Sequence, residues 1–143
     1  MTGQPADALQ VAVKALARRE LSAAELFERM TRSGISSDEA ARALERLRDR
    51  GYQSDERAAR ERARVLAERG LGDIGIRVDL RRRGLAVATV EPIIAELPPE
   101  RERARKLAVR VGAGRRLVQT LQRKGYSEDT ISTVAGADVA DVP

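Results

Sequence analysis

The sequence predicts an all-α protein built from three tandem helical repeats. One short phrase occurs three times, with two apolar residues four apart followed by a glycine and another apolar or aromatic residue. The copies are Leu26-x3-Met30-x3-Gly34-Ile35, Ile76-x3-Leu80-x3-Gly84-Leu85 and Leu117-x3-Leu121-x3-Gly125-Tyr126. Apolar residues four apart share one face of a helix, and glycine supplies the left-handed conformation that ends a helix.

Each copy of the phrase is flanked by two further amphipathic segments. The apolar residues ahead of the three copies are Leu9, Val13 and Leu16; Ala59, Ala63 and Leu66; Ala104, Leu107 and Val111. The pairs that follow the glycines are Ala40 and Leu44, Val90 and Ile94, Ile131 and Ala135. Each unit therefore holds three helices, and the spacing of the glycines suits stacked supersecondary units. We expect repeats at 1–53, 54–99 and 100–143, stacked into an elongated or curved array without strands.

The elements of the first repeat are marked by capping residues. A first helix is predicted over about residues 7–19. The next two helices each open with a capping box, formed by Ser22 with Glu25 and by Ser36 with Glu39. These helices are predicted to end at Gly34 and near Arg50, ahead of Gly51. Tyr52 is expected to pack back against the repeat.

The second repeat opens with a serine cap and contains the weakest part of the pattern. Ser54 precedes two acidic residues, which suit the positive end of a helix that closes at Gly70. Gly75 within the segment 71–76 disfavours helix, so this segment is predicted to be a flexible joint. After Gly84 no side chain offers an N-cap. Pro92 is expected to be tolerated only in the first turn of its helix.

The third repeat follows Leu97-Pro98-Pro99, which ends the second. Ala113-Gly114 turns the chain into a helix over 115–124, and Ser127 caps the last helix. Residues 1–6 are polar and contain a proline, and the segment after Gly136 lacks helical periodicity, so both ends are predicted to be loose.

The composition excludes several classes of chemistry. The 143 residues include no Cys and no His, so disulfides, ordinary zinc sites and the common nucleophile–base pairs are absent. No acidic pair stands apart from the arginine background, so we predict no enzyme activity, no cofactor, no metal and no small-molecule substrate. No run approaches the roughly 18 apolar residues of a membrane span. Without a signal-peptide pattern, a cytoplasmic protein with no membrane partner is expected.

The charge balance indicates an anionic partner. Lys and Arg number 27 against 22 Asp and Glu, which gives a net charge of +5, and the pI is about 10.4. The excess is largest in residues 100–143, which carry nine basic and six acidic side chains. Such a balance favours nucleic acid or an acidic protein surface. A GC-rich genome explains the preference for arginine equally well.

Clusters of basic residues around the second helix of each repeat are the candidate binding site. They are Arg18 and Arg19; Arg81, Arg82 and Arg83; Arg115, Arg116, Arg123 and Lys124. Equivalent helices of a stacked array present equivalent faces, so these residues are predicted to form one basic stripe that follows a phosphate backbone. Two alternatives remain open. Arg and Glu can simply alternate on solvated faces, as in 60–62 and 101–103, and cations can stabilise helix C-termini.

The residue types restrict how nucleic acid could be bound. Base stacking needs aromatic platforms, but Phe27, Tyr52 and Tyr126 are the only aromatic residues, and both tyrosines are predicted to fill cores. The chain has no Asn, which makes base reading by a helix-turn-helix a minor option. The glycines at 70, 72 and 75 follow a predicted helix, whereas a dinucleotide loop follows a strand, so this segment is predicted to be a turn. Any contact with nucleic acid is therefore expected to be electrostatic and independent of sequence.

Several segments together resemble the RecX regulatory protein family over about residues 9–135. They are Ala15-Leu-Ala-Arg-Arg-Glu20 with Ser22 and Glu25, Gly51-Tyr52 leading into Ser54-Asp55-Glu56-Arg57-Ala58-Ala59, Arg69-Gly70, Leu80-Arg-Arg-Arg-Gly84-Leu85 and Arg123-Lys-Gly-Tyr126. The resemblance implies three three-helix repeats and a non-enzymatic inhibitor of the RecA recombinase that binds its filament on single-stranded DNA. The competing hypothesis is a general accessory protein that coats DNA without contacting a recombinase.

Overall fold

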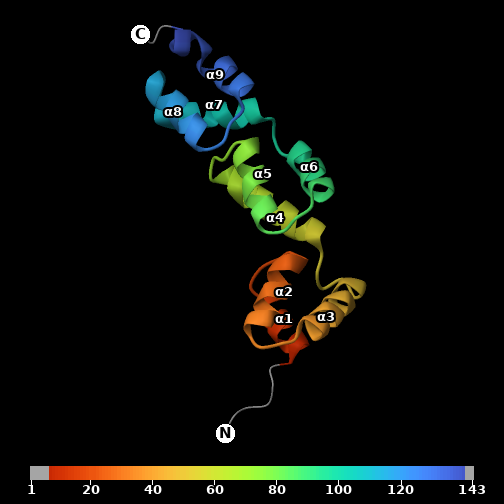
Figure 1. The fold of residues 1–143 in the computed structure, drawn as a ribbon. Coiled ribbons are helices and arrows are strands. Elements are labelled where there is room, and N and C mark those ends of the chain that lie inside the picture. The colour runs from red at the N-terminus through yellow and green to blue at the C-terminus, as the bar shows by residue number, and fades with distance from the viewer. Residues whose placement is uncertain (1–6, 141–143) are drawn as a thin grey trace.

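The protein is all-α, as the apolar periodicity predicted. The computed structural model describes the backbone of residues 7–140 and the side chains of residues 7–136, and this part of the chain contains nine helices and no strand. The helices form three groups of three along an elongated molecule, with α1 and α9 toward opposite ends (Figure 1). None of the described helices has the length and hydropathy needed to cross a membrane.

The first repeat contains α1 (Ala8–Leu16), α2 (Ala23–Arg32) and α3 (Ser37–Asp49). Its core is built around Leu26 and Met30 of the repeated phrase, both fully buried. The Ser22–Glu25 capping box is confirmed in both directions, since Ser22 Oγ accepts from the Glu25 amide and the Glu25 carboxylate accepts from the Ser22 amide. This short local pattern fixes where α2 begins.

The second repeat contains α4 (Asp55–Glu68), α5 (Asp73–Arg82) and α6 (Val87–Glu96). Ser54 caps α4, whereas Ala86 precedes α6 and gives it no side-chain cap, both as expected. The expectation for Pro92 was wrong, because it lies in the interior of α6. Proline has no backbone N–H, so α6 loses one helical hydrogen bond at Pro92. Pro92 is exposed and α6 ends soon after it, at Glu96, so this loss lies on the solvent side of a short helix.

The third repeat contains α7 (Glu100–Val111), α8 (Arg115–Arg123) and α9 (Glu128–Ala140). Ser127 Oγ accepts from the Thr130 amide and so caps α9, as predicted. The segment after Gly136 was expected to be loose, but α9 continues through it to Ala140. The predictions for residues 1–6 and 141–143 fall outside the described residues.

The two tyrosines that follow glycines differ in environment. Tyr126 is 4% exposed and its hydroxyl donates to the Gly70 carbonyl at 2.9 Å, so it fills a core as expected. Tyr52 is 60% exposed, and the prediction that it packs inward was wrong. The two positions are not equivalent, because Gly51 ends the third helix of a repeat and Gly125 ends the second. At the end of α3, Gln53 is the residue that turns inward.

The segment 71–76, predicted to be a flexible joint, makes close backbone contact with the third repeat. The Gly72 amide donates to the Lys124 carbonyl at 2.9 Å, and the Gly75 amide donates to the Gly125 carbonyl at 3.1 Å. A Cβ atom on Gly72 would lie 2.5 Å from the Gly125 carbonyl oxygen. Glycine is needed at both positions because the two backbones approach so closely.

Candidate anion-binding interface

A cationic hollow lies on the third repeat between α7, α8 and the end of α4. We call it the C-terminal hollow; its volume is about 500 Å³. Five basic side chains line it, and no carboxylate among the described residues does. They are Arg69, Arg110, Arg116, Arg123 and Lys124. Leu117 and Leu121 turn inward to the core, which leaves Arg116 and Arg123 on the outer side of α8, with Lys124 directly after the helix.

The first repeat has a hollow in the equivalent place, between α1 and α2. This N-terminal hollow has a volume of about 520 Å³ and is lined by Lys14, Arg18, Arg29 and Arg32. Arg32 and Arg123 occupy the same register, each two residues before the glycine that ends the second helix. Arg32 pairs with Glu28 on its own helix. The other three cations have no ion pair within the described residues.

The cations of the C-terminal hollow are available to bind an anion. The ion pairs found among residues 7–136 involve other arginines, not Arg69, Arg110, Arg116 or Arg123. The ammonium group of Lys124 donates to the Arg69 carbonyl at 3.2 Å, which holds it at the mouth of the hollow. Several like charges in one concave surface raise the local concentration of anions.

The middle repeat carries the carboxylate of Asp79 on its second helix, and this carboxylate binds Arg62 and Arg83. Asp79 accepts from Arg62 at 3.2 Å and from Arg83 at 2.8 Å, and Arg83 also donates to Glu25 of the first repeat at 3.0 Å. Burial of Asp79 opposes its charged form, but the hydrogen bonds from both arginines outweigh burial and hold the carboxyl pKa below its ordinary value. Arg83 therefore joins two repeats.

The structure brings together only part of the predicted basic stripe. Arg116, Arg123 and Lys124 share the C-terminal hollow, and Arg18 lies in the N-terminal one. Arg19 instead lines a hollow of mixed charge that also contains Glu20, Glu25 and Glu61. Three predicted residues, Arg81, Arg82 and Arg115, are exposed and line neither cationic hollow.

Five lining cations were missed by the sequence reasoning. Lys14, Arg29 and Arg32 belong to the N-terminal hollow, and Arg69 and Arg110 belong to the C-terminal one. The spacing of Lys14 and Arg18, four residues apart, already placed them on one helix face. No local pattern pointed to Arg69, because it comes from the end of α4 in the preceding repeat.

The chemistry of these hollows is electrostatic. Within the described residues, no group of three His, Cys, Asp or Glu side chains is placed to hold a metal ion. Guanidinium groups donate several hydrogen bonds in a fixed fork that matches phosphate and carboxylate oxygens. The hollows can therefore bind an anion.

Comparison with known proteins places this architecture in a family. Residues 8–47 match the family model for the first three-helix domain of RecX. The regulatory protein RecX of Trichlorobacter lovleyi is 32% identical over 148 aligned positions, which cover 92% of this chain and 96% of the relative. The chain belongs to the RecX regulatory protein family. RecX of Acidithiobacillus ferrooxidans is 31% identical, with 96% of this chain and 94% of that protein covered.

Solved structures support the fold of this RecX protein. The crystal structure of RecX from Lactobacillus salivarius superimposes with a TM-score of 0.80, covering 91% of this chain and 93% of that one at 19% identity. A second crystal structure, of a regulatory protein RecX, gives a TM-score of 0.78 at 18% identity and covers 89% of this chain and 70% of that one. The array of three-helix repeats is thus shared with these proteins.

Proposed function

We propose that this RecX protein is a non-enzymatic cytoplasmic regulator of recombination that binds the RecA filament on single-stranded DNA. It inhibits filament extension, ATP hydrolysis and strand exchange. The observation that supports this most directly is the pair of cationic hollows, one in the first repeat and one in the third. An elongated protein with two separated anion-binding surfaces can contact a repeating filament at more than one point.

Two contacts along one filament combine by avidity. Once one hollow is engaged, the other is held near the filament at high effective concentration, so weak contacts add to firm binding. The partner of each hollow is either phosphate exposed along the filament or an acidic surface of the recombinase. The exposed residues Arg81, Arg82 and Arg115, together with Arg19, add positive charge outside the two cationic hollows.

The alternative function is coating of DNA without contact with the recombinase. The same hollows favour it, because clustered arginines bind the phosphates of naked DNA as well. The two functions differ in stoichiometry. A filament regulator acts at few sites per filament, whereas a coating protein acts only when it covers the DNA.

The test is DNA-dependent ATP hydrolysis by the cognate RecA on single-stranded DNA with increasing amounts of this protein. The filament function predicts loss of activity well below the amount that saturates the DNA. Loss of activity only when the DNA is saturated would favour the coating function, and no loss at all would reject both.

A double charge reversal, Arg116→Glu with Arg123→Glu, tests the C-terminal hollow. We expect the amount of protein needed for half-inhibition to rise by about tenfold or more, since two cations are replaced by repulsive charges. Arg42→Glu with Arg46→Glu is the matched control, because these arginines are exposed on α3 and line neither hollow. Equal loss in both variants, at unchanged helicity by circular dichroism, would mean that only net charge matters.

A further inference from the structure

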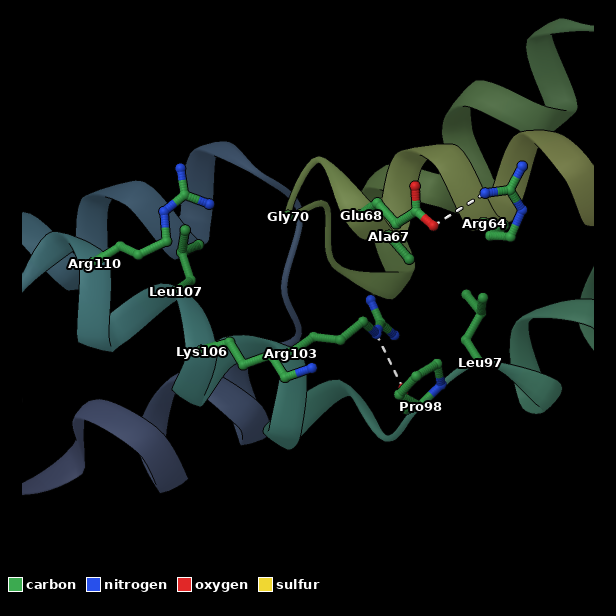
Figure 2. A pocket seen from close by; sticks show the side chains of 10 residues that line it. All are labelled: Arg64, Ala67, Glu68, Gly70, Leu97, Pro98, Arg103, Lys106, Leu107 and Arg110. Atoms are coloured by element: carbon green, nitrogen blue, oxygen red, sulfur yellow. Dashed lines mark hydrogen bonds and ion pairs between the residues drawn. The ribbon is translucent and has the colours of Figure 1, made fainter.

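A second hollow adjoins the C-terminal one and differs from it in chemistry. This junction groove lies between the C-terminal part of α4, the link from α6 to α7, and α7 (Figure 2). Its volume of about 450 Å³ is within the usual range of ligand pockets. It shares Leu107 and Arg110 with the C-terminal hollow, so the two surfaces are continuous.

The floor of the junction groove is aliphatic and is built from two repeats. Ala67 and Leu97 pack against the core of the second repeat, while Leu107 belongs to the core of the third. Pro98 is exposed at the edge. Neither repeat could form this floor alone, because its side chains come from both.

Arg103 fixes the shape of the junction groove. Its guanidinium donates to the Pro98 carbonyl at 3.0 Å and to the Leu71 carbonyl at 2.8 Å, and it pairs with Asp73 (Figure 2 shows the bond to Pro98). The side chain is buried, so its charge is used within the protein. These bonds hold the link between α6 and α7 against the preceding repeat.

The rim of the groove carries uncompensated positive charge. Figure 2 shows Arg64 paired with Glu68. The two atoms are 3.0 Å apart, and the pair contributes no net charge. Lys106 and Arg110 are exposed, and neither is in an ion pair with a described residue. A ligand that complements this groove therefore has an aliphatic group for the floor and carboxylates for the rim.

We propose that the junction groove binds an acidic peptide segment of a partner protein that carries one bulky aliphatic residue. The aliphatic side chain lies between Leu97 and Leu107, and flanking carboxylates contact Lys106 and Arg110. Burial of such a side chain is favourable because it leaves water for an apolar surface. A nucleic acid would not use this floor, since bases stack on aromatic rings and the groove has none.

The test is an NMR titration of the full chain with a short synthetic peptide that has a central leucine flanked by glutamates. We expect shifts of the amide signals of Ala67, Leu97 and Leu107. The same peptide with a central alanine should bind about tenfold more weakly. Flanking lysines should abolish binding. Oligothymidylate should shift the amides of Arg116 and Arg123 without those of Ala67 and Leu97.

Charge variants of neighbouring residues identify the groove as the site. Lys106→Glu should weaken binding of the leucine peptide by about tenfold. Arg105→Glu should leave it unchanged, because Arg105 is exposed on the same helix but does not line the groove. The proposal would be overturned if the two variants had equal effects, if the leucine and alanine peptides bound equally, or if the leucine peptide did not bind. The titration contains neither RecA nor DNA, so its outcome is independent of filament inhibition.

Discussion

The glycine that ends the second helix occupies the same register in all three repeats but has different neighbours. Gly34, Gly84 and Gly125 have φ values of +91°, +82° and +82°. A Cβ atom on Gly34 would meet nothing within 4 Å, whereas one on Gly84 would collide with Ala24 and one on Gly125 with Gly75. Gly34 is therefore needed only for its backbone conformation. Gly84 and Gly125 are needed for that conformation and also because the preceding repeat lies so close to them.

Replacing these glycines with alanine separates the two requirements. Gly34→Ala should cost roughly 1 to 2 kcal/mol of unfolding free energy, because a side chain is strained at positive φ. Gly125→Ala should cost about 1 to 3 kcal/mol more, since its methyl group must displace the backbone of Gly75. Urea unfolding followed by circular dichroism measures both. An equal loss of unfolding free energy in the two variants would show that the backbone of Gly75 moves aside at no measurable cost.

At the scale of the helices, Glu100 connects three elements through one carboxylate. It lies in the first turn of α7 and accepts from the Asp73 amide at the start of α5 at 2.7 Å. It also accepts from the hydroxyl of Ser127 at 2.7 Å and from the hydroxyl of Thr130, both at the start of α9. Asp55 makes a similar contact in the preceding junction, where it accepts from the Ala23 amide at 2.8 Å.

The stability of the protein should fall in acid partly through Glu100. Its burial opposes charge, but the hydrogen bonds from Thr130, Ser127 and the Asp73 amide outweigh burial and lower the carboxyl pKa below 4.5. A carboxyl group whose pKa is lowered in the folded state makes its full contribution to folding stability when the pH is above its ordinary pKa. That contribution is lost as the pH falls from about 4.5 through the lowered value.

The Glu100→Gln variant measures this contribution. It should be less stable than the parent at pH 7, and its unfolding free energy should fall less between pH 6 and pH 3. Urea unfolding of both proteins at a series of pH values measures these two differences. Glu102→Gln is the control, because Glu102 is exposed on the same helix turn and has no described partner. A parallel pH dependence in the parent and in Glu100→Gln would contradict the role of Glu100.

The helices were predictable because their signals are local. Apolar spacing placed the three repeated phrases in cores, and Ser22, Ser54 and Ser127 marked helix starts through bonds only three residues long. Pro92 and the segment 71–76 were misjudged, because their outcomes depend on helix exposure and on a backbone in another repeat. Periodicity within one segment carries no information on either.

At the scale of the whole molecule, the available positive charge is concentrated toward the two ends. The first and second helices of repeats 1 and 3 form cationic hollows, while Asp79 neutralises Arg62 and Arg83 in repeat 2. Counting charges along the sequence could not reveal this. Arg83 is paired with Glu25, which lies 58 residues away in the sequence, so the sequence alone does not distinguish its cluster from the unpaired ones.

Asp79 therefore controls how much positive charge the middle repeat offers. Asp79→Asn should free Arg62, while Arg83 keeps its pair with Glu25. If phosphate is the anion that the hollows bind, affinity for single-stranded oligothymidylate should rise. The logarithm of the binding constant should then fall more steeply with the logarithm of salt concentration, by about 0.7 for each added phosphate contact. Fluorescence anisotropy across a salt series measures the slope.

Glu91→Gln is the matched control for position, since it removes the same charge from the same repeat. It frees Arg77, which Glu91 binds at 2.7 Å between α5 and α6, a pairing that lies outside the two cationic hollows. Its salt dependence should change less than that of Asp79→Asn, because the freed arginine does not lie between the first and second helices of the repeat. Equal slopes in the two variants would show that DNA responds to net charge alone. A steeper slope only in Asp79→Asn would instead place the middle repeat on the same phosphate path as the two hollows.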